Sequence, residues 1–351
     1  MFIEKGKDLL ITFDYELFLG LQSGTVHECL IQPTEKILSI LNSYKLKSLF
    51  FVDTVYLYRL EEMAAVNTEC REDLDKIYVQ LKKIVASGHY IFPHIHPHWL
   101  DAEYIASQKE WRLANYRYYT FHSIPEEIRD QLFEVSVNII RKITSSLVPD
   151  YKIDCYRAGG WSIQPFSAFK KYFKKYGIKN EFSVVPGKYL KSDAHEFDFR
   201  KAPLKDIYRF DDDINSETKT GEFIEWTISC ISISKTENWF LNKYRSLLYR
   251  LHLSSKNKGS TVNSVTLGKE DIYTTSSGRQ RILASFEGLN LFFALKYCFC
   301  IYKQKRFQFI SHPKLLKNSD FFFLRTMLFF ISSFSHIHSD YKNQLEQYLG
   351  S

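Results

Sequence analysis

Residues 9–18, LLITFDYELF, form a short, continuously apolar run that contains two acidic residues, Asp14 and Glu16. A continuous rather than alternating apolar run is typical of a strand that is buried on both faces, as in parallel sheets. Residues two apart in an extended segment point to the same side, so the two carboxylates share one side of this strand. Burying both is costly unless a positive charge lies beside them. The run therefore predicts a buried strand, and it favours a metal ion near Asp14 and Glu16 over two carboxylates that simply reach solvent.

Six further runs of this kind follow, each bounded by turn residues or charge: LKSLFFVD, HYIFPHIH, DCYRAGG, NEFSVVPG, EFIEWTIS and RFQFISHP. Segments with helical spacing of apolar residues lie between several of them, at 32–46, 71–88, 124–147 and 164–177. Alternation of strand and helix indicates a parallel α/β architecture. Seven strands favour an incomplete barrel over a small open sheet. We therefore predict a distorted (β/α)7 barrel, in which the carboxyl ends of the strands share one face.

The chain of 351 residues is long enough for one barrel, and we expect a single domain over 1–351. Two regions depart from the alternating pattern. Residues 254–281 are polar and rich in Ser, Gly and Lys, which predicts an insertion with little apolar surface to bury. Residues 321–351 begin with an aromatic-rich stretch that predicts a helical extension covering the barrel.

Composition argues against several classes of protein. The formal net charge of +7 is dispersed, and no Lys/Arg block interleaved with aromatic residues indicates nucleic-acid binding. The first residues do not resemble a signal peptide, and the apolar segments 291–302 and 321–331 are short and each contains Lys or Arg. We expect a cytoplasmic protein without a transmembrane segment, and peripheral membrane contact stays open. The six cysteines are scattered, which favours packing roles over disulfides.

Residues 88–101, GHYIFPHIHPHWLD, hold four of the 11 histidines. Pro93 and Pro97 make a helix through this stretch unfavourable, so the backbone is expected to be extended or turning. His94, His96 and His98 then alternate along it and are all candidates to meet at one point. Imidazole and carboxylate ligands together suit zinc, with iron, cobalt or manganese as alternatives.

Two further features fall at predicted strand ends. Arg157 precedes a glycine pair in YRAGGW, where the backbone can approach a ligand closely, and His312 directly follows the last apolar run. In a parallel barrel these ends share one face. The residues expected to meet there are Asp14, Glu16, His94, His98, Arg157 and His312.

These stretches resemble, in order, the motifs of the NodB-homology polysaccharide deacetylases, carbohydrate esterase family 4. TFDYE resembles the family's first acidic motif in its DxE variant, and GHYIFPHIHPH aligns without a gap with its histidine motif. RAGG approaches the third motif, although Gly159 stands where the family has proline, and FQFISHP resembles the last. The resemblance spans Leu9 to Leu316 and implies a distorted barrel that removes N-acetyl groups from amino sugars.

Carried over by position, the resemblance implies that Asp14 is the general base, that Arg157 holds it in place, and that His312 is the general acid. It implies a divalent metal ion, most favourably zinc, on Glu16, His94 and His98. The residues expected to contact substrate are His96, Gly159, Gly160 and Trp161, and for His96 metal ligation stays open as an alternative. His89 is expected to be structural. The acidic residue that tunes the catalytic histidine in the family has no clear counterpart, and Glu225 is a weak candidate.

The expected substrate is an N-acetylated sugar in a polysaccharide or its precursor, in a divergent branch associated with surface-polysaccharide biosynthesis. Two alternatives stay open. One is a binuclear metallohydrolase that has an HxH pair centred on His96 and two metal ions, and that acts on another C–N or ester bond. The other is a non-catalytic sugar-binding protein on the same fold.

Overall fold

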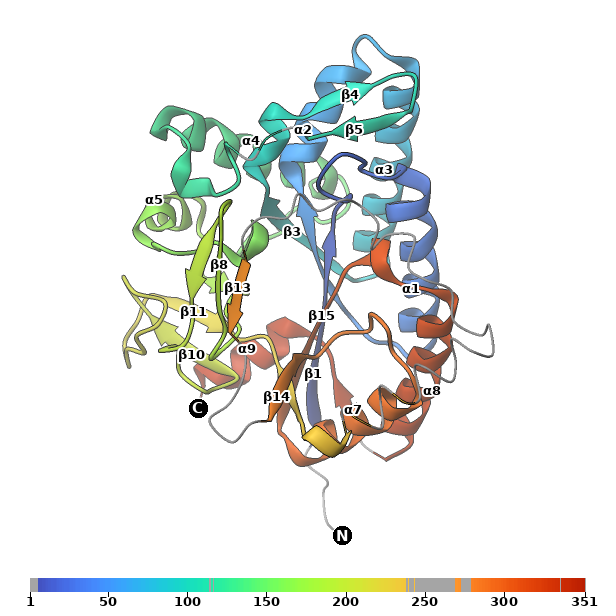
Figure 1. Cartoon of the computed structure of the whole chain (residues 1–351), viewed down its shortest axis with the longest axis vertical. Coiled ribbons are helices and arrows are strands. Elements are labelled where there is room, and N and C mark those ends of the chain that lie inside the picture. Colours follow the sequence, from blue (N-terminus) through green and yellow to red (C-terminus); the bar gives the residue numbers. More distant parts are fainter. Residues whose placement is uncertain are drawn as a thin grey trace.

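The computed structural model describes residues 6–113, 115, 117–237, 239, 243, 269–272, 279–334 and 336–350. All seven predicted strands are present in one nine-stranded sheet (Figure 1). They are β1 (Lys7–Tyr15), β2 (Leu49–Asp53), β3 (Tyr90–Ile95), β6 (Cys155–Ala158), β7 (Asn180–Glu181), β11 (Phe223–Trp226) and β15 (Arg306–Ser311). Neighbours in this set pair in parallel, in the order β11-β7-β6-β3-β2-β1-β15.

The order follows the chain and returns to its start, because the last strand, β15, lies beside the first, β1. The remaining gap, between β11 and β15, is bridged by the residues flanking β12 (Cys230–Ile233) and β14 (Gln280–Leu283). Two backbone hydrogen bonds cross it: the Ala284 amide donates to the Ser229 carbonyl at 2.9 Å, and the Ile310 amide donates to the Ala284 carbonyl at 3.0 Å. The Ile228 amide donates to the Val184 carbonyl at 2.9 Å and so extends the β11–β7 pairing. The predicted distorted barrel is therefore confirmed, with one irregular wall.

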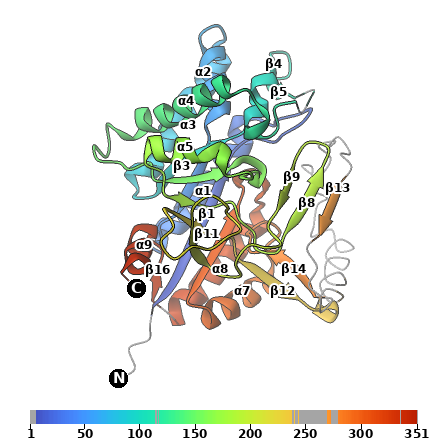
Figure 2. The same cartoon turned by 90° about the vertical axis from the view of Figure 1, so that its left-hand side faces the viewer.

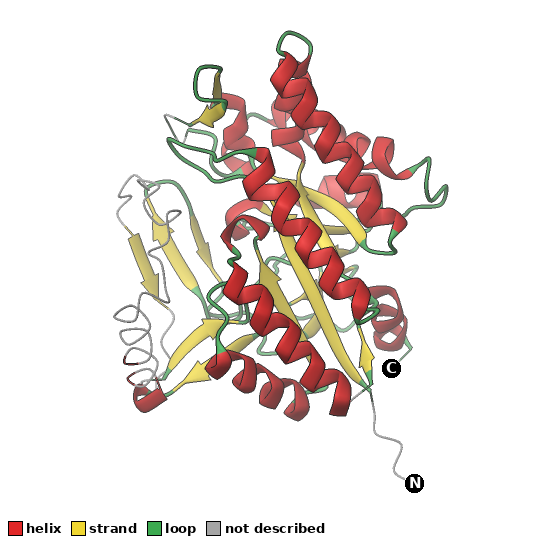
Figure 3. Ribbon diagram, turned by 90° about the vertical axis from the view of Figure 1, so that its right-hand side faces the viewer, coloured by secondary structure: helices red, strands yellow, loops and turns green. Residues whose placement is uncertain are grey.

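Helices cover the outer side of the sheet (Figure 3). The four predicted ones are α1 (Gln32–Ser43), α3 (Thr68–Ala86), α4 (Glu126–Thr144) and α5 (Ser167–Tyr176). An unpredicted helix, α2 (Thr54–Ala64), begins directly after β2. Its N-cap is Asp53, whose side chain accepts from the Tyr56 amide at 3.2 Å. The later helices are α7 (Leu291–Lys303), α8 (Asn318–Phe334) and α9 (Tyr341–Leu349).

Short elements complete the fold. Single helical turns are η1 (His27–Ile31), η2 (Pro97–Asp101), η3 (Phe121–Ser123), η4 (Gly159–Trp161) and η6 (Pro313–Leu315). The strands β10 (Ile207–Phe210) and β16 (Ile337–His338) join the main sheet, and β4 (Glu103–Ile105) pairs with β5 (Glu110–Arg112). A small sheet beside the barrel contains β8 (Tyr189–Ser192), β9 (Glu196–Asp198) and β13 (Lys269–Ile272) (Figure 2).

Most of the predicted insertion, 254–281, lies outside the described residues. Its described part supplies β13, which pairs antiparallel with β8, and the first residues of β14. Residues 321–351 contain most of α8, all of α9, and β16, which pairs with the start of β1.

The core explains the high aromatic content of the chain. Strand β1 contributes Phe13 and strand β2 contributes Phe50, and their ring centroids lie 5.1 Å apart. The ring centroids of Phe51 and Phe182 lie 5.3 Å apart.

All six cysteines are free, as predicted. Among the described residues, none of the helices is both long and apolar enough to cross a membrane.

Candidate metal and catalytic site

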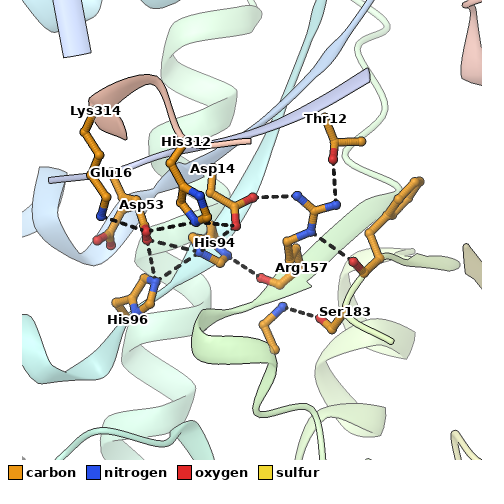
Figure 4. A network of polar contacts seen from close by, with 12 residues as sticks. Thr12, Asp14, Glu16, Asp53, His94, His96, Arg157, Ser183, His312 and Lys314 are labelled. Atoms are coloured by element: carbon orange, nitrogen blue, oxygen red, sulfur yellow. Dashed lines mark hydrogen bonds and ion pairs between the residues drawn. The ribbon is translucent and has the colours of Figure 1, made fainter. Parts of the chain in front are cut away.

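The carboxyl ends of four parallel strands bring most of the predicted site residues together (Figure 4). Asp14 lies near the end of β1, and Glu16 follows it. His94 lies near the end of β3, Arg157 in β6, and His312 directly after β15. Thr12, Asp14 and Glu16 alternate along β1, so their side chains share the barrel's inner side. The carboxylates and His94 are at most 5% exposed.

Three ligand atoms converge at the centre of this site: Glu16 Oε2, His94 Nε2 and His96 Nε2. Glu16 Oε2 lies 2.6 Å from His96 Nε2 and 3.4 Å from His94 Nε2, and the two nitrogens are 3.0 Å apart. Among the described residues this is the group of donors that could hold a metal ion. The Nδ1–H of His94 donates to the Arg157 carbonyl at 2.8 Å, which leaves the lone pair of Nε2 facing the group.

The geometry of this group fits a divalent ion. A tetrahedral zinc site with bonds of about 2.0 Å has ligand atoms about 3.3 Å apart, close to the separations found here. Glu16 Oε2 is buried and has no hydrogen-bond donor. A buried carboxylate oxygen without a donor is costly, and a cation removes that cost. One carboxylate and two imidazoles are a ligand set that suits zinc.

His98 lies outside this group, whereas His96, expected to contact substrate, lies inside it. The backbone stays extended through His96, with φ −111° and ψ 93°, so residues 94 and 96 point to the same side. Pro97 then starts the turn η2 and redirects His98. The His98 ring is 5.0 Å from that of His96, is 1% exposed, and has no hydrogen bond at either nitrogen. Burial and the neighbouring His96 lower the pKa of His98 well below its ordinary value.

Gly159 is the residue that gives the His96 ring its space. A Cβ at this position would lie 2.8 Å from His96 Nδ1 and 2.5 Å from the carbonyl oxygen of Ile95. Real Cβ atoms do not approach other atoms so closely. Gly159 and His96, the two positions that differ from the motifs that the sequence resembles, are thus neighbours in the fold.

Arg157 fixes Asp14 from inside the barrel. Its Nη1 lies 2.5 Å from Asp14 Oδ1, Nη2 donates to Thr12 Oγ1 at 2.8 Å, and Nε donates to the Phe182 carbonyl at 2.9 Å. Arg157 is fully buried, and its guanidinium stacks on the Phe51 ring at 4.2 Å. Burial raises the pKa of Asp14, but the charges of Arg157 and the site histidines outweigh it and lower that pKa. Asp14 is therefore held ionised with Oδ2 directed to the site.

His312 faces the same carboxylate from β15. Its Nε2 lies 3.5 Å from Asp14 Oδ2, and its Nδ1 lies 2.7 Å from Glu287 Oε1, which also accepts from the His312 amide. Burial lowers the pKa of His312, but Glu287 and then the site carboxylates raise it to about 9. The acidic partner of this histidine is therefore Glu287. Glu225, the weak candidate from the sequence, instead accepts from the Val184 amide and lies beside Glu181, so that assignment was wrong.

Two more charged residues of the site were not predicted from the sequence. Lys314 Nζ lies 3.0 Å from Glu16 Oε1 and donates to the Leu17 carbonyl at 2.6 Å. Burial raises the pKa of Glu16, but Lys314 and then His96 hold it well below its ordinary value. Asp53 ends β2 and accepts from the indole of Trp99, and burial raises its pKa to about 6. A carboxylate at a strand end was the available signal for Asp53, and a lysine two residues after His312 was the signal for Lys314.

The two residues after Gly159 lie next to other side chains of the small sheet and the loop before α4. Gly160 has φ +58°, and a Cβ there would meet the Tyr119 ring at 3.3 Å. Trp161 is half-buried, with Lys188 Nζ 5.1 Å from its ring centroid. His89 lies elsewhere: its ring nitrogens contact the Ser48 amide at 3.1 Å and Asn42 Oδ1 at 3.0 Å.

No family model and no curated protein matches the chain, but a solved structure shares its architecture. A solved structure from Mycobacterium smegmatis, assigned as a polysaccharide deacetylase, aligns with a TM-score of 0.50 and 11% identity, over 99% of this chain and 92% of its own. An allantoinase aligns with a TM-score of 0.45 and 9% identity, over 97% and 89%. The catalytic domain of a peptidoglycan N-acetylglucosamine deacetylase from Eubacterium rectale aligns at 0.36 and 8%, over 97% and 90%. The first alignment shows a shared fold. The other two are too weak to support a conclusion about this chain.

Proposed function

We propose that this protein is a metal-dependent hydrolase of the polysaccharide deacetylase type, which removes an N-acetyl group from an amino sugar in a polysaccharide or its precursor. The observation that carries the proposal is the approach of Asp14 Oδ2 and His312 Nε2, 3.5 Å apart, beside the Glu16–His94–His96 group. A buried base and a partly buried acid beside a metal-binding group suit amide hydrolysis, and binding alone needs neither.

The proposed ligands are Glu16, His94 and His96, with His96 in the place that the family resemblance gives to His98. Zinc is the favoured ion because two imidazoles and one carboxylate are typical ligands of zinc in proteins. When bound, such an ion acts as a Lewis acid that polarises the acyl oxygen and acidifies water. Lys314 occupies Glu16 Oε1, which leaves Oε2 as the oxygen directed at the ion.

Asp14 is the proposed general base. Arg157 occupies Oδ1, so the free oxygen, Oδ2, is the one that accepts a proton from the attacking water. The lowered pKa of Asp14 keeps this oxygen deprotonated at neutral pH. Arg157 is a positioning residue, since its contacts fix the carboxylate and it has no exposed surface with which to meet substrate.

His312 is the proposed general acid. Its pKa of about 9 makes it an imidazolium at neutral pH, with Nδ1–H held by Glu287 and Nε2–H directed into the site. The amine leaving an N-acetyl group is a poor leaving group unless it is protonated, and Nε2 supplies that proton. General acids and bases of this kind each contribute about 10²–10⁴-fold.

The sugar is proposed to lie against Trp161 and the neighbouring Gly159 and Gly160, because an indole face suits a sugar ring. A cytoplasmic location stays a prediction from the sequence.

The direct test combines metal analysis with acetate release from a panel of N-acetylated glycans. We expect about one zinc per chain and release of acetate by the wild type. Asp14→Asn should retain metal and lose turnover. His312→Ala should slow amide cleavage far more than cleavage of an activated ester, whose leaving group needs no proton. Two equivalents of metal would favour the binuclear alternative, and metal without acetate release from any glycan would favour the sugar-binding one.

A further inference from the structure

Helix α7 is apolar on both of its sides. Its inner positions, Phe293, Ala294, Tyr297 and Ile301, are buried against the barrel. Its outer positions repeat at helical spacing and are equally apolar: Leu291, Leu295, Phe299 and Tyr302 are 50%, 54%, 56% and 64% exposed. A helix that is apolar all round is normally covered on all sides. The outer side of α7 therefore presents apolar surface to solvent.

Helix α8 lies beside α7 and continues this surface. Cys298 Sγ of α7 lies 3.9 Å from the Met327 carbonyl of α8, and both helices lie on the outer side of the sheet (Figure 3). The inner side of α8 is buried. On its outer side Phe322, Phe329 and Phe330 are 64%, 59% and 41% exposed. We call the combined surface the α7–α8 face: Leu291, Leu295, Phe299, Tyr302, Phe322, Phe329 and Phe330.

The charges among these side chains are positive. Lys303 and Arg325 are exposed, and Lys303 Nζ lies 4.3 Å from the Phe299 ring centroid. Lys7 Nζ donates to the Tyr302 carbonyl at 2.6 Å and lies over the same residue's ring. The one acidic residue in the sequence of the two helices, Asp320, is only 2% exposed. The face is therefore aromatic and aliphatic with a basic fringe.

We propose that the α7–α8 face docks onto an anionic lipid surface. Phenylalanine and leucine side chains enter the boundary between headgroups and acyl chains, while Lys303 and Arg325 reach the lipid phosphates. Both helices lie flat in this arrangement. A second copy of the chain is less complementary, because its own α7–α8 face is also basic, whereas an anionic lipid surface carries the opposite charge.

Co-sedimentation of the full chain with vesicles tests this docking. We expect binding to phosphatidylcholine vesicles that contain phosphatidylglycerol, weak binding to phosphatidylcholine alone, and loss of binding at high salt. Phe299→Ser/Phe329→Ser should lower the partition coefficient about tenfold or more. The matched control is Val66→Ser/Leu204→Ser, which removes two apolar side chains that are 81% and 78% exposed elsewhere.

The charge contribution is tested separately. Lys303→Glu/Arg325→Glu should abolish the preference for anionic vesicles, whereas Lys82→Glu on α3 should not. The variants should keep the circular dichroism and the acetate release of the wild type on a soluble substrate. Failure of the docking is then distinct from failure of the proposed hydrolase.

Equal vesicle binding by the serine variant and its control overturns the proposal. So does a dimer, detected by analytical ultracentrifugation, that Phe299→Ser/Phe329→Ser dissociates, because the face then belongs to a second copy.

Discussion

A single missing side chain at position 159 decides where an imidazole can lie. The His96 ring occupies the space that any Cβ at 159 would need, 2.8 Å from the His96 Nδ1 atom. The backbone of Gly159 is not in the left-handed region, so alanine is excluded here by contact rather than by its own conformation. Gly159 is thus a positioning residue for the proposed third ligand.

Gly159→Ala should displace His96 and lower zinc affinity by about 10–100-fold, the cost typical of disturbing a ligand's support. Competition with a chelating indicator measures this affinity. In a His96→Ala background the same substitution should lower zinc affinity less, because the contact with the ring is gone and only the contact with the Ile95 carbonyl remains. Gly350→Ala, whose Cβ would meet nothing closer than 3.4 Å, is the control. Equal losses in both backgrounds would contradict the link between the two residues.

The sequence could place Asp14, His94 and His312 because each sits at or just after an apolar run whose end must reach the site. It could not separate His96 from His98, because that choice depends on where the strand stops being extended. Pro97 turns the chain one residue after His96. Glu287 was beyond reach for another reason: it lies in a loop whose position depends on how the barrel closes.

That loop, between β14 and α7, is the element that sets the protonation of the proposed acid. Glu287 raises the pKa of His312 to about 9, so His312 stays protonated as pH rises and loses its proton only above that value. Glu287→Gln removes this charge and lowers the pKa. The alkaline limb of the pH profile of kcat/KM should then move to lower pH by about one unit or more. An unchanged limb would contradict the acid role of His312.

His89, directly before β3, also has a shifted pKa, and this shift affects the stability of the fold rather than catalysis. Burial, together with Lys47, lowers the pKa of His89 to about 4, below its value of about 6.5 in the unfolded chain. The unfolded state therefore binds more protons between these values, and stability falls as pH decreases through this window. From pH 7.5 to pH 5 this residue should cost about 2 kcal/mol of unfolding free energy.

Denaturant unfolding of the wild type and His89→Gln at these two pH values measures that cost. The variant is expected to lose less stability on acidification, by about the same amount. Parallel losses in the two proteins would show that His89 does not carry the effect.

At the level of elements, the seven strands were predictable because buried parallel strands are continuously apolar. Helix α2 was not, because its first residues, Thr54, Val55 and Tyr56, are β-favouring and directly continue the apolar run of β2. The helix forms there because Asp53 caps it and its apolar side packs on the barrel.

For the whole molecule, the proposed ion would join two strands that are not neighbours. Glu16 follows β1, and His94 and His96 belong to β3 and its end, with β2 between them. Ligand binding stabilises the folded state by about 2.7 kcal/mol at a hundredfold excess over Kd. Zinc should therefore raise Tm by about 5 °C or more relative to the protein treated with chelator.

This shift also discriminates between the two ligand assignments. Scanning fluorimetry should show that Glu16→Gln/His94→Gln and His96→Ala lose the response to zinc, while His98→Ala keeps it. The reverse pattern for His96 and His98 would restore the ligand set implied by the family resemblance.

Closure of the barrel was the global feature least accessible from sequence. Strand number and order follow from local patterns, whereas the wall between β11 and β15 is made of chain segments that are not themselves strands of the barrel, around Ile228 and Ala284.

That irregular wall has a consequence for how this architecture can diversify. In a continuous ladder of paired strands, inserting or deleting one residue within a strand shifts the pairing register. The length of such a strand is therefore fixed. Among the described residues the wall has isolated backbone hydrogen bonds, at Ser229 and Ala284. Changes of length beside this wall therefore leave the register of β1, β3 and β15 unchanged, and with it the placement of Asp14, His94 and His312.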